Sequence, residues 1–252
     1  MPFVVAVIVY VVAAVADRGR GWPWHRVAVW CSGMAIAAAG FVGPLATAAH
    51  DNFTAHMWAH LLVGMLAPLL LVLAAPMTLA LRTMSVSPAR RVSRVLRGRF
   101  GRILVNPIVA ASLNIGAMWV VYLTPLFELM QQVVLVHLLV MLHFLAAGCL
   151  YTFVLVPVDP SPHKASFLFR ALVLVASLAA HGMLAKLLYA SPPPGVSIVD
   201  ARTGAQLMFY GGDLVDLVLI ALLCAEWYRV SGRRGLTGRG ETLHGQDAER
   251  RR

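Results

Sequence analysis

The chain of 252 residues is strongly apolar: 60% of its residues are hydrophobic, 13% are charged, and its mean hydropathy is +0.76. A water-soluble domain is only about half apolar, so this composition argues against a soluble protein and predicts a membrane protein. The net charge of +10 does not indicate nucleic-acid binding, because the basic residues lie between apolar runs and lack interleaved aromatic residues. The three cysteines, Cys31, Cys149 and Cys224, show no CxxC spacing, which gives no support to a disulfide framework, a zinc ribbon or a redox pair.

Seven apolar runs are candidate membrane spans, since a helix needs about 20 apolar residues to cross a bilayer. In chain order they cover residues 2–16, 27–49, 57–81, 104–124, 131–157, 167–190 and 206–229. We therefore expect an all-α, polytopic transmembrane helix bundle in which residues 1–230 form a single integral membrane domain. We expect the remaining residues, 231–252, to form a disordered basic tail.

The basic residues predict the orientation of the bundle. Of the 21 Lys and Arg residues, 19 fall on one side of the membrane, Arg202 falls on the other, and Lys186 lies near a span end. The positive-inside rule then places the N-terminus outside and the C-terminus in the cytoplasm. The basic segment 82–102 is either an orientation signal alone or an interfacial helix that binds anionic lipid head groups.

Two further features concern the third span and the last exterior connection. Pro68 and Pro76 lie within the third run, where they free backbone carbonyls and are expected to kink the helix. The segment Ser191–Ala205 is the longest exterior connection. It is either a lid over the outer face or a plain loop.

Histidines dominate the ionisable side chains inside the predicted spans, and each is a functional candidate because charge is unfavourable in hydrocarbon. At a rise of about 1.5 Å per residue, five of the six lie in the outer half of the membrane, on four helices, and His143 lies nearer the midplane. The six are His50, His56, His60, His137, His143 and His181. Such clustering at one depth favours a shared site over scattered core histidines.

His56 and His60 form an HxxxH pattern, in which the two imidazoles differ by about 40° around a helix and so face the same side. Two such nitrogens can share one metal ion. Asp51, Met57 and Met141 add oxygen and thioether ligands, and thioether with imidazole suits copper, especially Cu(I), better than calcium or magnesium. The alternative is structural, since buried methionines usually pack and histidines can bond between helices.

Two acids, Asp213 and Asp216, lie three residues apart in the last run. Three roles are open for them: a proton relay, hydrogen-bond partners that orient ligating histidines, or a structural pair with Lys186. Lys186 lies near the outer end of the sixth run and could instead extend to the membrane surface.

Four stretches carry recognisable motifs. They are HMWAHLLVGMLAPLLLVLAAPMTLALR, with His56, His60, Pro68, Pro76 and Arg82; HLLVMLHFLAAGCLYTFVLVPVDPSPHKAS, with His137, His143, Gly148, Asp159 and Pro160; LVLVASLAAHGMLAKLLY, with His181; and GAQLMFYGGDLVDLVLIALLCAEWYR, with Gln206, Gly211, Gly212 and Asp213. Over about residues 25–230, this ordered set resembles the CtaG-type cytochrome c oxidase assembly factor family.

The resemblance implies a role in the maturation of haem-copper terminal oxidases at the copper-delivery stage, in the plasma membrane. It implies the oxidase subunits and the lipid bilayer as partners, a copper chaperone as a candidate donor, and no nucleic acid. In this interpretation the histidines of the outer half take up Cu(I) and release it to the oxidase by ligand exchange.

Other functions remain open at this point. Paired histidines on facing helices also ligate haem iron, so the chain could be a haem-binding membrane cytochrome or a haem-handling protein. A copper or proton transporter would use Asp213 and Asp216 as a relay. The sequence contains no nucleophile elbow, P-loop or dinucleotide fingerprint, so we do not expect an enzyme.

Overall fold

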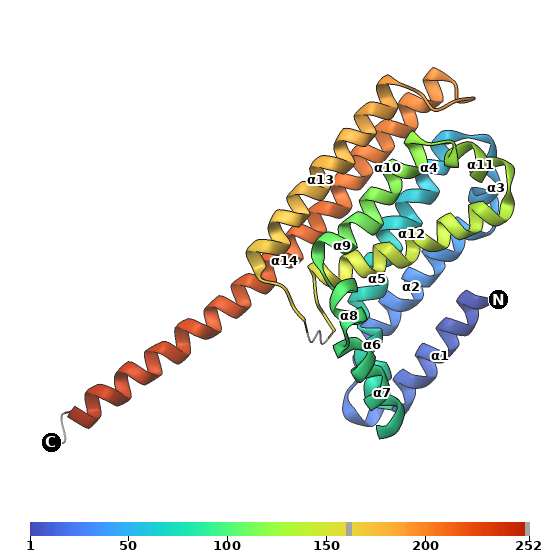
Figure 1. Cartoon of the computed structure of the whole chain (residues 1–252). Coiled ribbons are helices and arrows are strands. Elements are labelled where there is room, and N and C mark those ends of the chain that lie inside the picture. Colours follow the sequence, from blue (N-terminus) through green and yellow to red (C-terminus); the bar gives the residue numbers. More distant parts are fainter. Residues whose placement is uncertain (160–162, 250–252) are drawn as a thin grey trace.

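The structure, a computed structural model, describes residues 1–159 and 163–249, and every regular element in these ranges is helical (Figure 1). The elements are α1 (Pro2–Ala16), a short 3₁₀ turn (Arg18–Arg20), α2 (Trp24–Phe41), α3 (Pro44–Asp51), α4 (Phe53–Leu61), a first π turn (Leu62–Leu66), α5 (Ala67–Leu73), α6 (Pro76–Thr83), α7 (Val86–Arg97), α8 (Arg99–Leu104), α9 (Pro107–Ala111), a second π turn (Ser112–Gly116), α10 (Ala117–Leu123), α11 (Leu126–Gln132), α12 (Val134–Leu155), α13 (Phe167–Ala190) and α14 (Ile198–Glu249). Helices α13 and α14 pack along one side of the bundle, and α1 lies against α2 (Figure 1). The expected all-α class is confirmed.

Several helices are suited to a membrane. Within the described ranges, four segments are long and apolar enough to cross one: Phe53–Leu73, Val134–Leu155, Phe167–Ala190 and Ile198–Ser231. Two bent pairs could each form a further span, α2 with α3 at 41° and Pro107–Leu123 with α11 at 81°, and α1 is a shorter apolar helix. These helices indicate a membrane protein. The count of seven spans, the orientation and the division into domains stay predictions.

The helical segment that carries the HxxxH pattern ends earlier than expected. The sequence predicts one span over residues 57–81, whereas the structure has a continuous helix over Phe53–Leu73 and a separate helix from Pro76. Ala75 between them has φ 53°, which is left-handed backbone, and Pro76 has no N–H with which to continue the helix. Pro76 therefore starts a new helix instead of kinking the old one.

The last span begins earlier than expected. The sequence predicts its start at residue 206, but α14 begins at Ile198, so residues 198–205 are helical and do not belong to the exterior connection. The Ser197 hydroxyl accepts a hydrogen bond from the Asp200 N–H at 3.3 Å, which is a favourable way to begin a helix. At its other end α14 continues through residues 231–249, where the sequence predicts a disordered tail (Figure 1).

Two π turns interrupt the helices. In the first, the Ala67 N–H bonds to the Leu62 carbonyl five residues earlier. Pro68 follows and has no N–H to offer the Gly64 carbonyl. Such turns occur often at functional sites, and in this chain both π turns line the same cavity.

Helices α4 and α6 begin with the same type of cap, supplied by a distant carboxylate. At the start of α4, Asp200 of α14 accepts hydrogen bonds from the N–H groups of Phe53, at 2.7 Å, and Thr54, at 3.0 Å. At the start of α6, Asp159 accepts bonds from the first-turn N–H groups in the same way, at 3.1 and 2.7 Å. A carboxylate at a helix N-terminus is stabilising because it satisfies free N–H groups and opposes the helix dipole. The two capped segments, Phe53–Leu73 and α6, lie on either side of the break at Ala75.

A buried ion pair joins α13 to α14 at the opposite end. Arg170 is 2% exposed, and its Nη1 atom donates to the Leu155 carbonyl at 2.6 Å and to the Glu226 carboxylate at 2.8 Å. Lys164 pairs with the same carboxylate. Arg170 lies in the first turn of α13, inside the predicted run 167–190, where its charge has a partner.

Candidate functional site

Three histidines from three helices meet near the end of the bundle where α4, α12 and α14 begin, which the sequence predicts to be the outer end. They are His50 of α3, His56 of α4 and His137 of α12. The ring centroids of His50 and His137 are 4.5 Å apart, and those of His56 and His137 are 6.4 Å apart. His56 and His137 are buried, and His50 is exposed. We call these three residues the outer histidine cluster.

Two imidazole nitrogens of the cluster, one on His56 and one on His137, have no hydrogen-bond partner in the described part of the chain. The Nε2 atom of His56 lies 3.1 Å from the Tyr122 hydroxyl, which in turn points its hydrogen at the Met57 sulfur, 4.0 Å away. The Phe127 ring centroid lies 5.5 Å from that of His56. The Nδ1 atoms of His56 and His137 are buried, and neither has a hydrogen-bond partner in the described part of the chain. Because buried polar atoms are normally paired, two unpaired nitrogens in one cluster indicate a place for a ligand.

A cleft of about 650 Å³ lies beside the outer histidine cluster, with His50 in its lining. The connection 194–197 and helix α11 contribute to its walls. The carboxylates of Asp51, Glu128 and Asp200 also line it. Acidic walls favour the approach of a cation.

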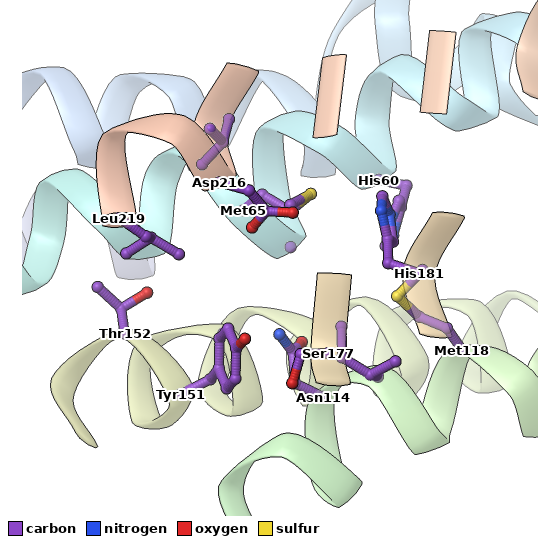
Figure 2. Close-up of a pocket in the computed structure, with 14 residues that line it drawn as sticks. His60, Met65, Asn114, Met118, Tyr151, Thr152, Ser177, His181, Asp216 and Leu219 are labelled. Atoms are coloured by element: carbon purple, nitrogen blue, oxygen red, sulfur yellow. The ribbon is translucent and has the colours of Figure 1, made fainter. Parts of the chain in front are cut away.

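A second group of polar side chains lines a small cavity deeper in the bundle (Figure 2). Its volume is about 20 Å³, which is room for one water molecule or one ion. His60 of α4 is 4% exposed and His181 of α13 is 2% exposed, and the Nε2 atom of each has no hydrogen-bond partner in residues 1–159 or 163–249. The other polar and sulfur-bearing side chains of the lining are Met65, Asn114, Met118, Tyr151, Thr152, Ser177 and Asp216. We call this space the inner cavity.

The HxxxH pattern is divided between these two places. His56 belongs to the outer histidine cluster, where it packs against His137. His60 lines the inner cavity, and its ring packs against Phe144 with the centroids 5.4 Å apart. The spacing suggests one shared metal ion, but the structure gives each histidine its own surroundings.

Other candidate ligands lie apart from both places or pack against apolar residues. His143 is exposed, and its Nε2 atom lies 2.8 Å from the Leu113 carbonyl. Met141 is 3% exposed and packs within a small apolar cluster with Val63. Met57 is fully buried beneath the Tyr122 hydroxyl. Metal binding by any of these residues stays a prediction.

The two acids of the last span also separate. Asp216 is 4% exposed and lines the inner cavity, whereas Asp213 is exposed on the surface of α14. The Lys186 ammonium lies 5.3 Å from the centroid of the Phe209 ring, and the ion pairs found in the described residues do not include it. Asp213 and Asp216 therefore do not share one buried site, and a proton relay through them stays a prediction.

Three neutral side chains that were not predicted as site residues lie beside the histidines in the structure. Asn114 and Met118 line the inner cavity, and Tyr122 contacts His56. All three lie within the predicted span 104–124, where no ionisable pattern singles them out. A buried amide and a buried phenol inside an apolar run were the signals that could have found two of them, because both groups need hydrogen-bond partners in hydrocarbon.

The donor atoms limit which metal either place could hold. Across the described ranges, no three His, Cys, Asp or Glu side chains lie close enough together to hold a metal ion. That excludes from these residues the set of three or four such ligands that a zinc site uses. Imidazole and thioether donors, which the two places do offer, suit Cu(I).

The fold and its buried polar sites define a membrane helix bundle with histidines between its helices. The family described as cytochrome c oxidase caa3 assembly factor, Caa3_CtaG, matches residues 8–230, and the chain belongs to this family. The resemblance inferred from the sequence motifs is thereby confirmed.

The chain is also similar to uncharacterized mycobacterial proteins. It is 29% identical over 244 residues to proteins of Mycobacterium bovis and Mycobacterium tuberculosis, covering 88% of this chain and 37% of each relative. It is 26% identical over 240 residues to a protein of Mycobacterium leprae, covering 87% of this chain and 36% of the relative. The chain thus spans little more than a third of the length of these curated relatives. No solved structure matches it.

Proposed function

We propose that this protein assists the assembly of a haem-copper cytochrome c oxidase in the cell membrane by holding Cu(I) at the outer histidine cluster. Membership of the caa3 assembly factor family supports the general role. The observation that carries the copper assignment is the pair of buried, unpartnered Nδ1 atoms of His56 and His137 in the described part of the chain. His50, whose ring contacts His137, lines the acidic cleft beside the cluster and is a candidate for the first contact of an entering ion, not for a third ligand beside His56 and His137.

The hydrogen bonds around His56 suit this chemistry. In the tautomer that leaves Nδ1 free, the Nε2–H of His56 donates to the Tyr122 oxygen, and the Tyr122 hydroxyl points to the Met57 sulfur. A partner on the second ring nitrogen fixes both the tautomer and the orientation of a ligating imidazole. The cluster thus presents neutral imidazole nitrogens, which are suitable donors for Cu(I).

Delivery then needs only ligand exchange. Cu(I) enters through the cleft, whose acidic lining attracts a cation. As bonds form between the ion and the ligands of the receiving oxidase subunit, its bonds to His56 and His137 break. The copper stays cuprous throughout, so no electron donor or acceptor takes part. A copper chaperone is a suitable donor at the mouth of the cleft.

Replacing His56 and His137 together with alanine is expected to weaken Cu(I) binding at the outer histidine cluster by more than about 100-fold, because both free nitrogens are lost. An anaerobic competition titration against a chromophoric Cu(I) chelator measures this on the detergent-purified chain. In cells whose own copy is deleted, the same variant should fail to restore the copper content of the oxidase. His143→Ala is the matched control, since His143 lies outside the cluster. Unchanged Cu(I) affinity in the double variant would refute the assignment.

Replacing Tyr122 with phenylalanine tests the role of its hydroxyl. We expect about 10- to 100-fold weaker Cu(I) binding, because the His56 ring loses the partner that fixes its tautomer. The same chelator competition measures the affinity, and copper X-ray absorption should still show nitrogen ligands. Tyr228→Phe serves as the control, because Tyr228 is exposed on α14 and lines neither the cleft nor the inner cavity. Equal affinity in wild type and Tyr122→Phe would show that the hydroxyl does not orient a ligand.

A further inference from the structure

The inner cavity has the properties of a binding site that is distinct from the outer histidine cluster. It is lined by residues of α4, both π turns, α10, α12, α13 and α14. Three buried polar atoms at its lining residues have no hydrogen-bond partner in the described part of the chain: Nε2 of His60, Nε2 of His181 and the Tyr151 hydroxyl. Each of these side chains is at least nine-tenths buried. Buried groups of this kind are rarely left unpaired, so the cavity is suited to a bound partner.

The donor atoms at one end of the cavity are soft. Met118 is 2% exposed, and Figure 2 shows its sulfur directed toward the side of the cavity where His60 and His181 lie. Two imidazole nitrogens and one thioether are the kinds of donor that suit Cu(I) and do not suit calcium or magnesium.

The charge of the cavity also favours a cation. Asp216 is the only acid among the lining residues, and it is 4% exposed. A carboxylate inside a membrane bundle is unfavourable unless a positive partner offsets its charge. Lys and Arg are absent from the lining, so a bound monovalent cation would supply that charge.

Two glycines allow the histidine rings to reach their positions. A Cβ atom on Gly212 of α14 would overlap Cε1 of His181, and one on Gly64 of the first π turn would lie 3.3 Å from Cε1 of His60. Any larger residue at Gly212 would therefore displace the His181 ring. Each glycine thus lies against the Cε1 edge of one ring. The Nε2 atom of that ring has no hydrogen-bond partner in the described residues and is available to ligate a metal ion.

We propose that the inner cavity is a second Cu(I) position, with His60, His181 and Met118 as its ligands. This inference rests on the proposed function, since it extends the path of the same ion. His56 and His60 are one helical turn apart, about 6 Å along α4, so the HxxxH pattern links two successive positions. Cu(I) moves between them by exchange, as bonds to His56 and His137 break and bonds to His60 and His181 form. The ion keeps its oxidation state.

Cu(I) stoichiometry on the full, detergent-purified chain tests this. Anaerobic titration of the wild type should give two Cu(I) per chain. Replacing both His60 and His181 with alanine should leave one, and replacing His56 and His137 should also leave one. His143→Ala should leave two. Thermal unfolding of each variant without copper verifies that it is folded.

A milder variant identifies the sulfur ligand without emptying the cavity. Met118→Leu preserves the volume of the side chain and should remove sulfur scattering from the copper X-ray absorption spectrum. Met130→Leu is the matched control, because Met130 is equally buried in the same apolar cluster but does not line the cavity. Gly212→Ala should lower the stoichiometry to one by displacing His181.

The results separate the two proposals. One Cu(I) in the wild type, lost only when His56 and His137 are replaced, overturns the second position and leaves the proposed function intact. One Cu(I) that is lost only when His60 and His181 are replaced supports the inner position and overturns the outer assignment. No Cu(I) in the wild type overturns both. A sulfur signal that survives Met118→Leu overturns the assignment of Met118.

Discussion

Replacing Gly148 with alanine is expected to lower the free energy of unfolding by about 3 kcal/mol, because α12 would have to move away from the first π turn. A Cβ atom at this position would overlap the Gly64 carbonyl oxygen and would lie 2.7 Å from Cγ of Pro68. One of these atoms is backbone and the other belongs to a rigid ring, so neither can move aside easily. Denaturant titration in detergent, followed by circular dichroism, measures the loss.

The same substitution at Gly116 provides the control. A Cβ atom there would find its nearest neighbour, the Ser112 Cβ, at 3.9 Å, which is an ordinary contact. Gly116→Ala should therefore leave the stability unchanged or raise it slightly, since alanine favours a helix. Equal stability of the Gly148→Ala and Gly116→Ala variants would contradict the close approach of α12 to the π turn.

Replacing Glu226 with glutamine is expected to lower the free energy of unfolding by about 3 kcal/mol, because it leaves a buried guanidinium without a negative partner. Arg170 would keep its bond to the Leu155 carbonyl but lose the carboxylate that accepts from both of its terminal nitrogens. Lys164 would lose the same partner. Thermal unfolding in detergent at neutral pH measures the effect.

Two further variants show whether the unpaired charge causes the loss. Glu128→Gln changes an exposed acid that takes part in none of the ion pairs found in the described residues, and it should alter the stability by less than about 0.5 kcal/mol. Combining Arg170→Met with Glu226→Leu removes both charges and should recover most of the loss, since apolar residues can replace a buried ion pair. A Glu226→Gln variant as stable as Glu128→Gln would show that the pair does not stabilise the α13–α14 contact.

The helices themselves could be predicted from the sequence because the bilayer sets the length of an apolar run. The predicted run 167–190 coincides with α13, Phe167–Ala190. The predicted ends are wrong where local backbone chemistry decides them, as at Ala75, whose left-handed φ has no signal in the sequence. Likewise the sequence assigns Asp200 to an exterior connection, although it lies in the first turn of α14 and caps α4.

Only part of the candidate site could be predicted from the sequence. Counting residues along each span placed His56 and His137 in the same outer half of the membrane, and the structure does bring their rings together. The same counting could not separate His56 from His60, because the partners of each ring come from α12 and α13 and depend on how helices pack. The neutral partners, such as Tyr122, have no spacing pattern at all. They become recognisable only when the bundle is assembled.

The cap on α4 bears on the order in which the protein matures. The outer histidine cluster is complete in the chain once His137 has been made, whereas the carboxylate that caps α4 belongs to Asp200, 147 residues after Phe53. During synthesis the cluster histidines therefore precede the group that fixes the start of the helix carrying His56. That helix gains its final anchor only when α14 has joined the bundle. Until the last helix has joined the bundle, the start of α4 has only its local cap, in which the Asn52 side chain accepts a hydrogen bond from the Ala55 N–H.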